Sequence, residues 1–153
     1  MAHAMITRRY RFCAAHRLHT DQLSPKENVT VFGKCNNLNG HGHNYVVFVS
    51  VRGEIDPKTH QVLDGHRLDA IVDRTVLQRF DHRDLNQDRA FANRTTTGEN
   101  LVLLMWDLLV NEIPEGRLAK VGVIETRDNY FEYSGENSGS SASVSAEQED
   151  RHG

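Results

Sequence analysis

The feature that most constrains this chain is the pair His41 and His43, which alternate at the start of a run of alternating apolar residues. On an extended strand, residues i and i+2 point to the same face, so the two imidazoles can lie side by side. Gly40 and Gly42 leave room for the close approach of backbone or ligand. The run predicts a strand over residues 43–53 that begins with two ligands for one metal ion. A third histidine nearby would complete the open three-ligand zinc site of an enzyme.

A third imidazole is available at the end of another predicted strand, over residues 6–16, whose even-numbered side chains share one face. An alternative is a structural zinc site, because a Cys-x-x-His pair followed by a further Cys and His resembles a Cys/His zinc knot. On a regular strand, however, Cys13 and His16 face opposite ways, and we interpret Cys13 as a small core residue. We therefore predict the zinc ligands to be His16, His41 and His43.

The order of the remaining elements indicates an α+β fold with two strands, two helices and two strands. The segment 19–39 is expected to be a long loop, and residues 61–64 a short edge strand. The apolar spacing predicts a helix over about 66–80. A second helix is expected to start at Thr96, with Glu99 three residues later as a capping box. The last two strands are predicted over residues 118–125 and 130–133.

Length and composition predict one globular domain: the chain has 153 residues, 38% of them hydrophobic and 25% charged. We expect the domain to span residues 5–133. Residues 1–4 carry no pattern and would be an addition or a disordered start, and the Ser-rich, Gly-rich, acidic segment 134–153 would be disordered. No apolar run is long enough for a membrane span. Two cysteines without a disulfide framework favour the reducing cytoplasm.

The charge pattern bears on the ligand. The net charge is −3 and no basic stripe is present, which argues against a nucleic-acid partner. Residues 1–45 nevertheless carry six Lys or Arg residues against two acidic ones. This basic segment is either a solvated face or a site for a phosphorylated small molecule.

Three further positions have both a chemical and an ordinary explanation. Cys35, beside Lys34 and a divalent cation, would favour the thiolate form that a nucleophile or proton acceptor needs, although an isolated thiol is more often simply buried. The pair Asp81-His82 follows a helix end, where a polar turn explains it equally well. Glu125 ends an apolar strand face, so it needs a partner if buried: a salt bridge, or the N–H groups of a pterin or guanine edge.

Five segments, taken together and in this order, resemble the 6-pyruvoyltetrahydropterin synthase family. They are Phe12-Cys13-Ala14-Ala15-His16-Arg17-Leu18, Cys35 to Tyr45, Phe80-Asp81-His82-Arg83-Asp84-Leu85-Asn86, Thr97-Gly98-Glu99-Asn100 and Glu125-Thr126. The resemblance covers about residues 5–133. The Cys-x5-His-x-His spacing favours the pyruvoyl enzyme over its 6-carboxytetrahydropterin relative, in which the spacing is typically shorter. Two departures are Gly98, where relatives carry a second Thr, and the segment Asp64-Gly65-His66.

The resemblance implies roles for these positions. One Zn²⁺ per subunit would be bound by the three histidines. Cys35 would be the general acid/base and would form a triad with Asp81 and His82 across a subunit boundary. The pterin would be held by three residues: Glu125, Thr97 and Glu99.

The same resemblance implies the tunnelling fold, a four-stranded antiparallel sheet with two helices on one face. Three subunits would join their sheets into a barrel, and two trimers would form a homohexamer. The substrate would be 7,8-dihydroneopterin triphosphate, with Mg²⁺ assisting its triphosphate, in tetrahydrobiopterin biosynthesis. Two alternatives stay open: a sister enzyme that makes 6-carboxytetrahydropterin or cleaves the pterin side chain, and a non-catalytic zinc- or pterin-binding module.

Overall fold

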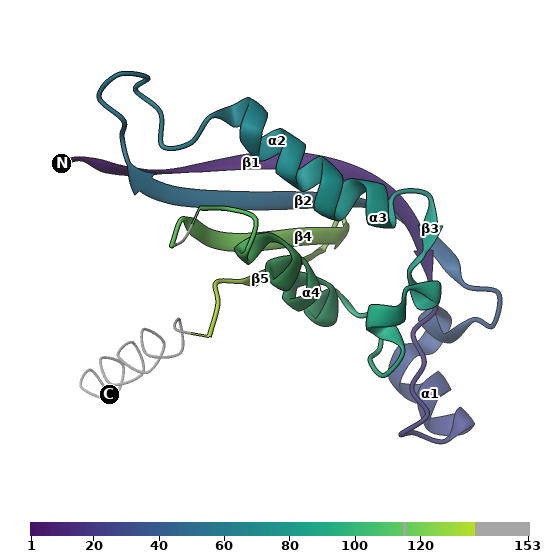
Figure 1. Cartoon of the computed structure of the whole chain (residues 1–153). Coiled ribbons are helices and arrows are strands. Elements are labelled where there is room, and N and C mark those ends of the chain that lie inside the picture. The colour runs from purple at the N-terminus through teal and green to yellow at the C-terminus, as the bar shows by residue number, and fades with distance from the viewer. Residues whose placement is uncertain (115, 137–153) are drawn as a thin grey trace, which may run out of the picture.

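The computed structural model describes residues 1–114 and 116–136, in which a five-stranded mixed sheet carries the helices (Figure 1). In spatial order the strands are β3 (Arg83–Asp84), β1 (His3–His16), β2 (His41–Glu54), β4 (Leu118–Thr126) and β5 (Asn129–Tyr133). Strands β1, β2, β4 and β5 pair antiparallel, whereas β3 pairs parallel to β1. The fold is therefore α+β, as predicted, but the sheet has one strand more than expected.

The helices follow the sheet in two groups. Figure 1 shows α2 (Gly65–Val72) and α3 (Gln78–Phe80) along β1 and β2, and α4 (Gly98–Val110) near β4 and β5. A π-helical turn, Asp73–Leu77, joins α2 to α3, so the predicted helix over 66–80 is confirmed as one continuous helical segment. At the far end of β1 lie α1 (Pro25–Phe32) and a 3-10 turn (Gly33–Asn36). Two further 3-10 turns precede α4, at Leu85–Gln87 and Arg89–Phe91.

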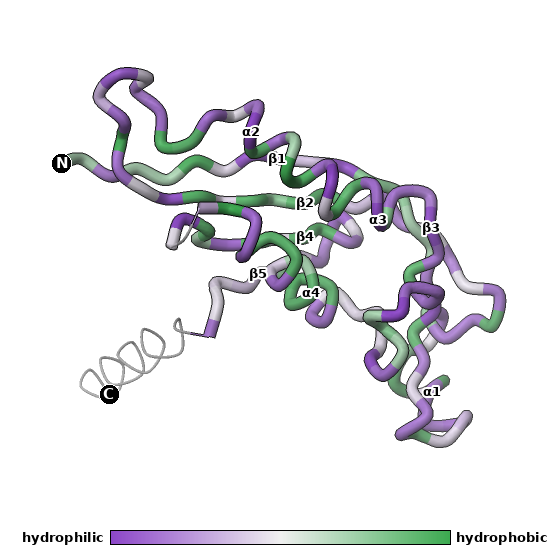
Figure 2. Tube along the Cα trace, in the orientation of Figure 1, coloured by the Kyte–Doolittle hydropathy of each residue, from purple (hydrophilic) through white to green (hydrophobic). Residues whose placement is uncertain are grey.

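Strand β2 has alternating apolar side chains that bury one of its faces. Its residues Tyr45, Val47, Val49 and Val51 are all buried, and they join one core with apolar residues of α2 and α4. In Figure 2 the most hydrophobic stretches include β2, β4 and α4. The opposite face is more polar: Arg9, on β1, lies over the Phe48 ring with 5.2 Å from guanidinium carbon to ring centroid. One face of the sheet is thus covered by helices, as an amphipathic sheet requires.

The register of β1 against β2 determines what the end of the sheet presents. His16 pairs with His41, Ala14 with His43 and Phe12 with Tyr45. The turn into β2 needs Gly40, whose φ is +73° and where a Cβ would lie 3.2 Å from the carbonyl oxygen of His16. The predicted use of a glycine for close backbone approach is therefore confirmed at position 40.

Three local predictions are wrong, each because a capping signal was misjudged. The segment 19–39 contains α1, which starts with a capping box between Ser24 and Glu27. The N-cap of α4 is Thr97, not Thr96, and its hydroxyl accepts a hydrogen bond from Asn100 N. Residues 61–64 form no strand; Asp64 caps α2 instead, and its carboxylate accepts from the amide of His66.

Two further expectations about β1 need correction. Its pairing starts at His3, opposite Glu54, so it includes two residues that were expected to precede the domain. Cys13 is exposed rather than part of the core, and its thiol donates to Asn44 Oδ1 at 3.0 Å. Of the tail that was predicted over residues 134–153, the part from residue 137 onward lies outside the described residues. No helix within the described part of the chain is long and apolar enough to cross a membrane.

The core of α4 allows a direct test of this packing. Leu101 is fully buried, whereas Asp107 in the same helix is exposed. Replacing Leu101 by alanine removes buried apolar volume, and we expect the free energy of unfolding to fall by about 2–5 kcal/mol. Asp107→Ala should change it by less than about 0.5 kcal/mol. Urea unfolding followed by circular dichroism measures both, and equal losses would contradict this assignment of the buried helix face.

Candidate metal centre

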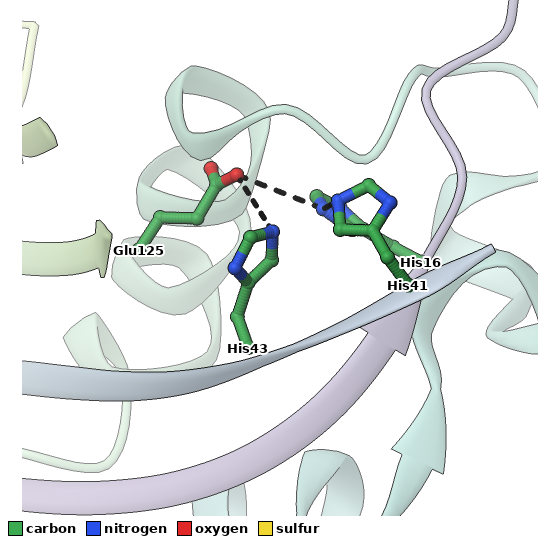
Figure 3. Close-up of side chains that lie close together, drawn as sticks. All are labelled: His16, His41, His43 and Glu125. Atoms are coloured by element: carbon green, nitrogen blue, oxygen red, sulfur yellow. Dashed lines mark hydrogen bonds and ion pairs between the residues drawn. The ribbon is translucent and has the colours of Figure 1, made fainter. Parts of the chain in front are cut away.

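Three histidines and one glutamate converge at the end of the sheet where β1 stops and β2 begins. Figure 3 shows His16, His41 and His43 with Glu125, which reaches them from β4. One ligand atom from each lies within 4.8 Å of every other. His16 Nε2 is 3.0 Å from His41 Nε2, and Glu125 Oε1 is 3.2 Å from His43 Nε2. Side chains from three adjacent strands thus surround one point.

The orientation of His16 is fixed by a residue far away in the sequence. Its Nδ1 lies 2.9 Å from the carbonyl oxygen of Thr96, just before α4. Because a carbonyl can only accept, Nδ1 carries the proton and Nε2 keeps its lone pair. A hydrogen bond of this kind commonly orients a metal-binding histidine. Both residues are buried, at 1% exposure each.

Burial favours the neutral form of two of these histidines, His16 and His43. Burial, together with the nearby His41 and His43, lowers the pKa of His16 to about 4 despite the opposing hydrogen bond to Thr96. Burial also lowers the pKa of His43. The contacts of His16 and His43 with Glu125 have ion-pair distances, but neutral imidazoles form no ion pair. Burial and the charge of Glu99 raise the pKa of Glu125 in turn.

Within the described residues, side chains of this cluster lack partners that a divalent cation would supply. His43 Nε2 is buried without a hydrogen-bond partner in the described chain, although the carboxylate lies beside it. Nitrogen atoms of three imidazoles and an oxygen of a carboxylate thus lie around one point. A divalent cation would accept the lone pairs of the three imidazoles, and its charge would stabilise the carboxylate beside them. The three predicted ligands, His16, His41 and His43, all lie at this point.

Cys35 lies in the 3-10 turn after α1, and a hydrogen-bond network holds that turn against the end of β1. The carbonyl oxygen of Cys35 accepts from Leu18 N at 2.8 Å. The buried side chain of Asn36 donates to Leu18 O, and Arg17 Nε donates to Asn36 O. Burial and the charge of Glu125 raise the pKa of the Cys35 thiol. The thiolate expected from the sequence thus depends on a cation that offsets these effects.

Asp81 and His82 form a pair at a different place. His82 Nδ1 is 3.0 Å from Asp81 Oδ1, which also accepts from Cys13 N at 2.9 Å. His82 has a φ of +58° and donates its amide to Cys13 O. The pair is thereby clamped to β1, with the imidazole exposed. In the described chain its hydrogen bonds do not reach Cys35, so the predicted triad is not assembled within one subunit.

The start of α4 carries the remaining predicted residues. Thr97 is half-buried and Glu99 is exposed, and Glu99 influences Glu125 through its charge. Between them, Gly98 is buried against Phe131 of β5: a Cβ at this glycine would lie 2.2 Å from the Phe131 ring. The aromatic ring therefore fills the space that a side chain at position 98 would need.

A cavity of about 950 Å³ opens beside the histidines. His16 forms part of its wall, together with polar side chains of the segment 17–22 and of the loop before α4. Two guanidinium groups, of Arg17 and Arg94, line it, as do the carboxylates of Asp21 and Asp84. The buried Asn28 holds one wall in place, because its amide group makes hydrogen bonds to Thr20, Leu23 and Ser24.

Fold and site together define a class: an α+β protein with a buried three-histidine centre, beside a carboxylate, at the end of its sheet. Residues 5–136 match the model of the family described as 6-pyruvoyl tetrahydropterin synthase, and the chain belongs to this family. It is 46% identical over 134 residues to the human 6-pyruvoyl tetrahydrobiopterin synthase, covering 87% of this chain and 92% of that protein. The Drosophila melanogaster protein of the same name is 44% identical, over 86% and 80%.

A solved structure supports the same assignment. The Caenorhabditis elegans 6-pyruvoyl tetrahydropterin synthase superposes with a TM-score of 0.85 at 41% identity, covering 89% of this chain and 98% of that one. A Plasmodium vivax 6-pyruvoyltetrahydropterin synthase, at 16% identity and a TM-score of 0.64, shows the shared fold alone.

Several supporting residues could not be found from the sequence. Thr96 was read as a helix cap, yet its carbonyl orients His16. Phe131 carries no motif, and its contact with Gly98 depends on how β5 packs on α4. Only the Ser24 to Glu27 pattern was a local signal, and it would have revealed α1.

The contact between Gly98 and Phe131 predicts a coupled pair. Gly98→Ala forces the ring to move, and we expect a loss of about 1–3 kcal/mol in the free energy of unfolding. In a Phe131→Ala background the same change should be neutral or stabilising, because alanine favours the helix. A double-mutant cycle by urea unfolding measures the coupling, and additive effects would show that the ring does not occupy this space.

Proposed function

We propose that the chain is a zinc-dependent 6-pyruvoyltetrahydropterin synthase. It converts 7,8-dihydroneopterin triphosphate into 6-pyruvoyltetrahydropterin and releases inorganic triphosphate. The observation that supports this most is the convergence of three imidazoles beside a buried carboxylate, in a chain of this family. The elimination redistributes oxidation level within the substrate, so no external redox cofactor is required.

The three histidines would hold one Zn²⁺ per subunit. When bound, it polarises the side-chain hydroxyls of the substrate and makes the adjacent C–H protons more acidic. Three neutral ligands preserve the full charge of the ion for this purpose. The protein contributes the fixed geometry: the hydrogen bond from His16 to Thr96 keeps one lone pair directed at the centre.

Glu125 would accept hydrogen bonds from the amino-pyrimidine edge of the pterin. Its carboxylate is buried and has no hydrogen-bond donor from a side chain of the described residues. A planar edge rich in N–H groups would supply that donor and favour the ionised carboxylate. Thr97 and Glu99, at the start of α4, would contact the pterin from the side.

Proton transfer would fall to Cys35, working with Asp81 and His82 of another subunit. The pair Asp81–His82 is exposed and clamped to β1, so it is available to a neighbouring chain. Each positioned acid or base contributes roughly a hundred- to ten-thousandfold in rate. The proposal therefore includes a homohexamer, a dimer of trimers with the sheets joined in a barrel, which would also cover the sheet edges. Both thiols are free, as a cytoplasmic location would require.

The cavity beside His16 would receive the triphosphate. Arg17 and Arg94 offer guanidinium donors, and Arg17 is held by its hydrogen bond to Asn36 O. The carboxylates of Asp21 and Asp84 offset this positive charge. A triphosphate would then be accommodated best with Mg²⁺, which neutralises part of its charge.

A product assay tests the proposal. Purified, zinc-loaded protein is incubated with 7,8-dihydroneopterin triphosphate, and the products are identified by mass spectrometry. Triphosphate release with the mass of 6-pyruvoyltetrahydropterin is expected. A carboxylated or side-chain-cleaved product would assign the chain to a sister activity, and the absence of turnover with zinc bound would favour a binding module.

Cys35→Ala separates chemistry from metal binding. We expect turnover to fall by at least about a hundredfold, because the proton acceptor is lost. Zinc content should stay at one ion per subunit, as measured by plasma mass spectrometry. Cys13→Ala is the matched control and should keep its activity. Normal turnover of Cys35→Ala would remove this thiol from the mechanism.

His41→Ala tests the ligand set. Mutation of a residue that only orients a metal ligand often costs about 10- to 100-fold in metal affinity, so loss of a direct ligand should cost at least about 100-fold. Competition with a chromogenic chelator measures the zinc dissociation constant. The control is His19→Ala, since His19 lies outside the cluster, bonded to Asn36. Stoichiometric, tightly bound zinc in His41→Ala would show that the ligand set is wrong.

A further inference from the structure

Three buried side-chain polar atoms have no hydrogen-bond partner in the described part of the chain: His41 Nδ1, His43 Nε2 and Tyr45 OH. Two of them belong to the histidines of the metal centre. The third, the phenol hydroxyl of Tyr45, is on a side chain only 1% exposed. Buried hydroxyls nearly always have a partner, so an unpaired one needs an explanation. Because Tyr45 lies among the site residues, its hydroxyl would gain a hydrogen-bond partner when the site binds a metal ion.

The ring of Tyr45 is held in place on several sides. It stacks on Phe12 with 4.8 Å between ring centroids and an interplanar angle of 11°. The rings of His43 and His16 meet it edge to face, at 5.7 and 6.3 Å. A ring packed in this way cannot turn its hydroxyl toward bulk solvent, so the direction of the O–H group is set by the core.

Glu125 is the acceptor next to this hydroxyl in the sheet. Val46 of β2 pairs with Ile124 of β4. Continuing this antiparallel register by one pair places Tyr45 opposite Glu125. Side chains directly opposite each other lie on the same face and are nearest neighbours. In agreement, the charge of Glu125 contributes, after burial, to the raised pKa of Tyr45.

Metal binding changes which groups can donate a hydrogen bond to Glu125. In the metal-free chain Oε1 lies beside the Nε2 atoms of His43 and His16, at 3.2 and 3.6 Å. His16 Nε2 carries no proton, because Nδ1 donates to Thr96 O. A cation would also occupy the Nε2 lone pair of His43, so neither nitrogen can donate to the carboxylate in the metal-loaded protein. The carboxylate needs another donor on this face of the sheet, and the phenol is a neutral donor without a partner.

We propose that the Tyr45 hydroxyl donates a hydrogen bond to the Glu125 carboxylate in the metal-loaded protein. Tyr45 is then a positioning residue: it holds the carboxylate directed at the N–H groups of the ligand. This role rests on the proposed function for the identity of the ligand, a pterin. The hydrogen bond itself depends only on metal binding.

The first test compares two phenol deletions in the metal-free protein. Tyr10 OH donates to Asp69 Oδ1 at 2.7 Å, so Tyr10→Phe removes an existing bond and should lower the thermal midpoint. Tyr45→Phe removes a hydroxyl without a partner and should leave the midpoint unchanged or raise it. A loss in Tyr45→Phe as large as that in Tyr10→Phe would mean the hydroxyl is already paired, and would overturn the proposal.

The second test looks for the bond after zinc is added. We expect Tyr45→Phe to lower the thermal midpoint of the zinc-loaded protein, with zinc content unchanged, and to have no further effect in a Glu125→Ala background. Such coupling in the zinc-loaded protein, absent in the metal-free protein, is the signature of the proposed bond. Equal effects of Tyr45→Phe in both backgrounds would overturn it.

The third test measures the consequence for the ligand. Zinc-loaded Tyr45→Phe should bind 7,8-dihydroneopterin about 10- to 100-fold more weakly than the parent chain, by calorimetry, because a charge-assisted bond that orients Glu125 is lost. Unchanged affinity would contradict the positioning role. If the parent chain itself does not bind this pterin, the proposed function fails, and the zinc-dependent coupling of the second test still decides whether Tyr45 bonds Glu125.

Discussion

The antiparallel register between β1 and β2 is the constraint on which the rest of the structure depends. It sets His16 opposite His41 and Ala14 opposite His43, so that three imidazoles meet on one face. The small side chain of Ala14 leaves space beside the His43 ring. A slip of one residue would turn every β2 side chain to the other face, moving the valines out of the core together with the histidines. Core packing and the metal centre are therefore specified by the same pairing.

Hydrogen bonds from segments outside β1 and β2 hold the site residues and the surrounding loops in place. The carbonyl of Thr96 selects the His16 tautomer, and the amide of Asn36 joins the turn of Cys35 to the end of β1. Asn28 makes four hydrogen bonds within the segment 20–28, although it contacts no predicted site residue. These buried amides act as rigid connections, because breaking any one of them leaves polar groups unpaired. Polar networks thus help to order the loops around the site.

The sequence predicted the parts of the site that are encoded by local periodicity. Strand alternation placed His41 and His43 together, and a second strand ending supplied His16. The position of Glu125 beside them depends on the pairing of β4 with β2, which no local pattern specifies. Cys13 was misassigned because an alternating strand has two faces, and the sequence does not show which one the helices cover. Thr96 fits the capping-box pattern with Glu99, but Thr97, the last of three consecutive threonines, is the residue that caps the helix.

Within the described residues, the buried side-chain polar atoms without a hydrogen-bond partner all lie at the metal centre. A bound cation would change this. Away from the site, buried polar groups such as Asn28 have their partners. At the site, neutral imidazoles and a carboxylate with a raised pKa face one another, and the unpaired atoms lie on His41, His43 and Tyr45. Natural proteins tend to concentrate such conflicts where they bind something. A cation and a ligand bound here would complete the hydrogen bonding and the charge balance of the core.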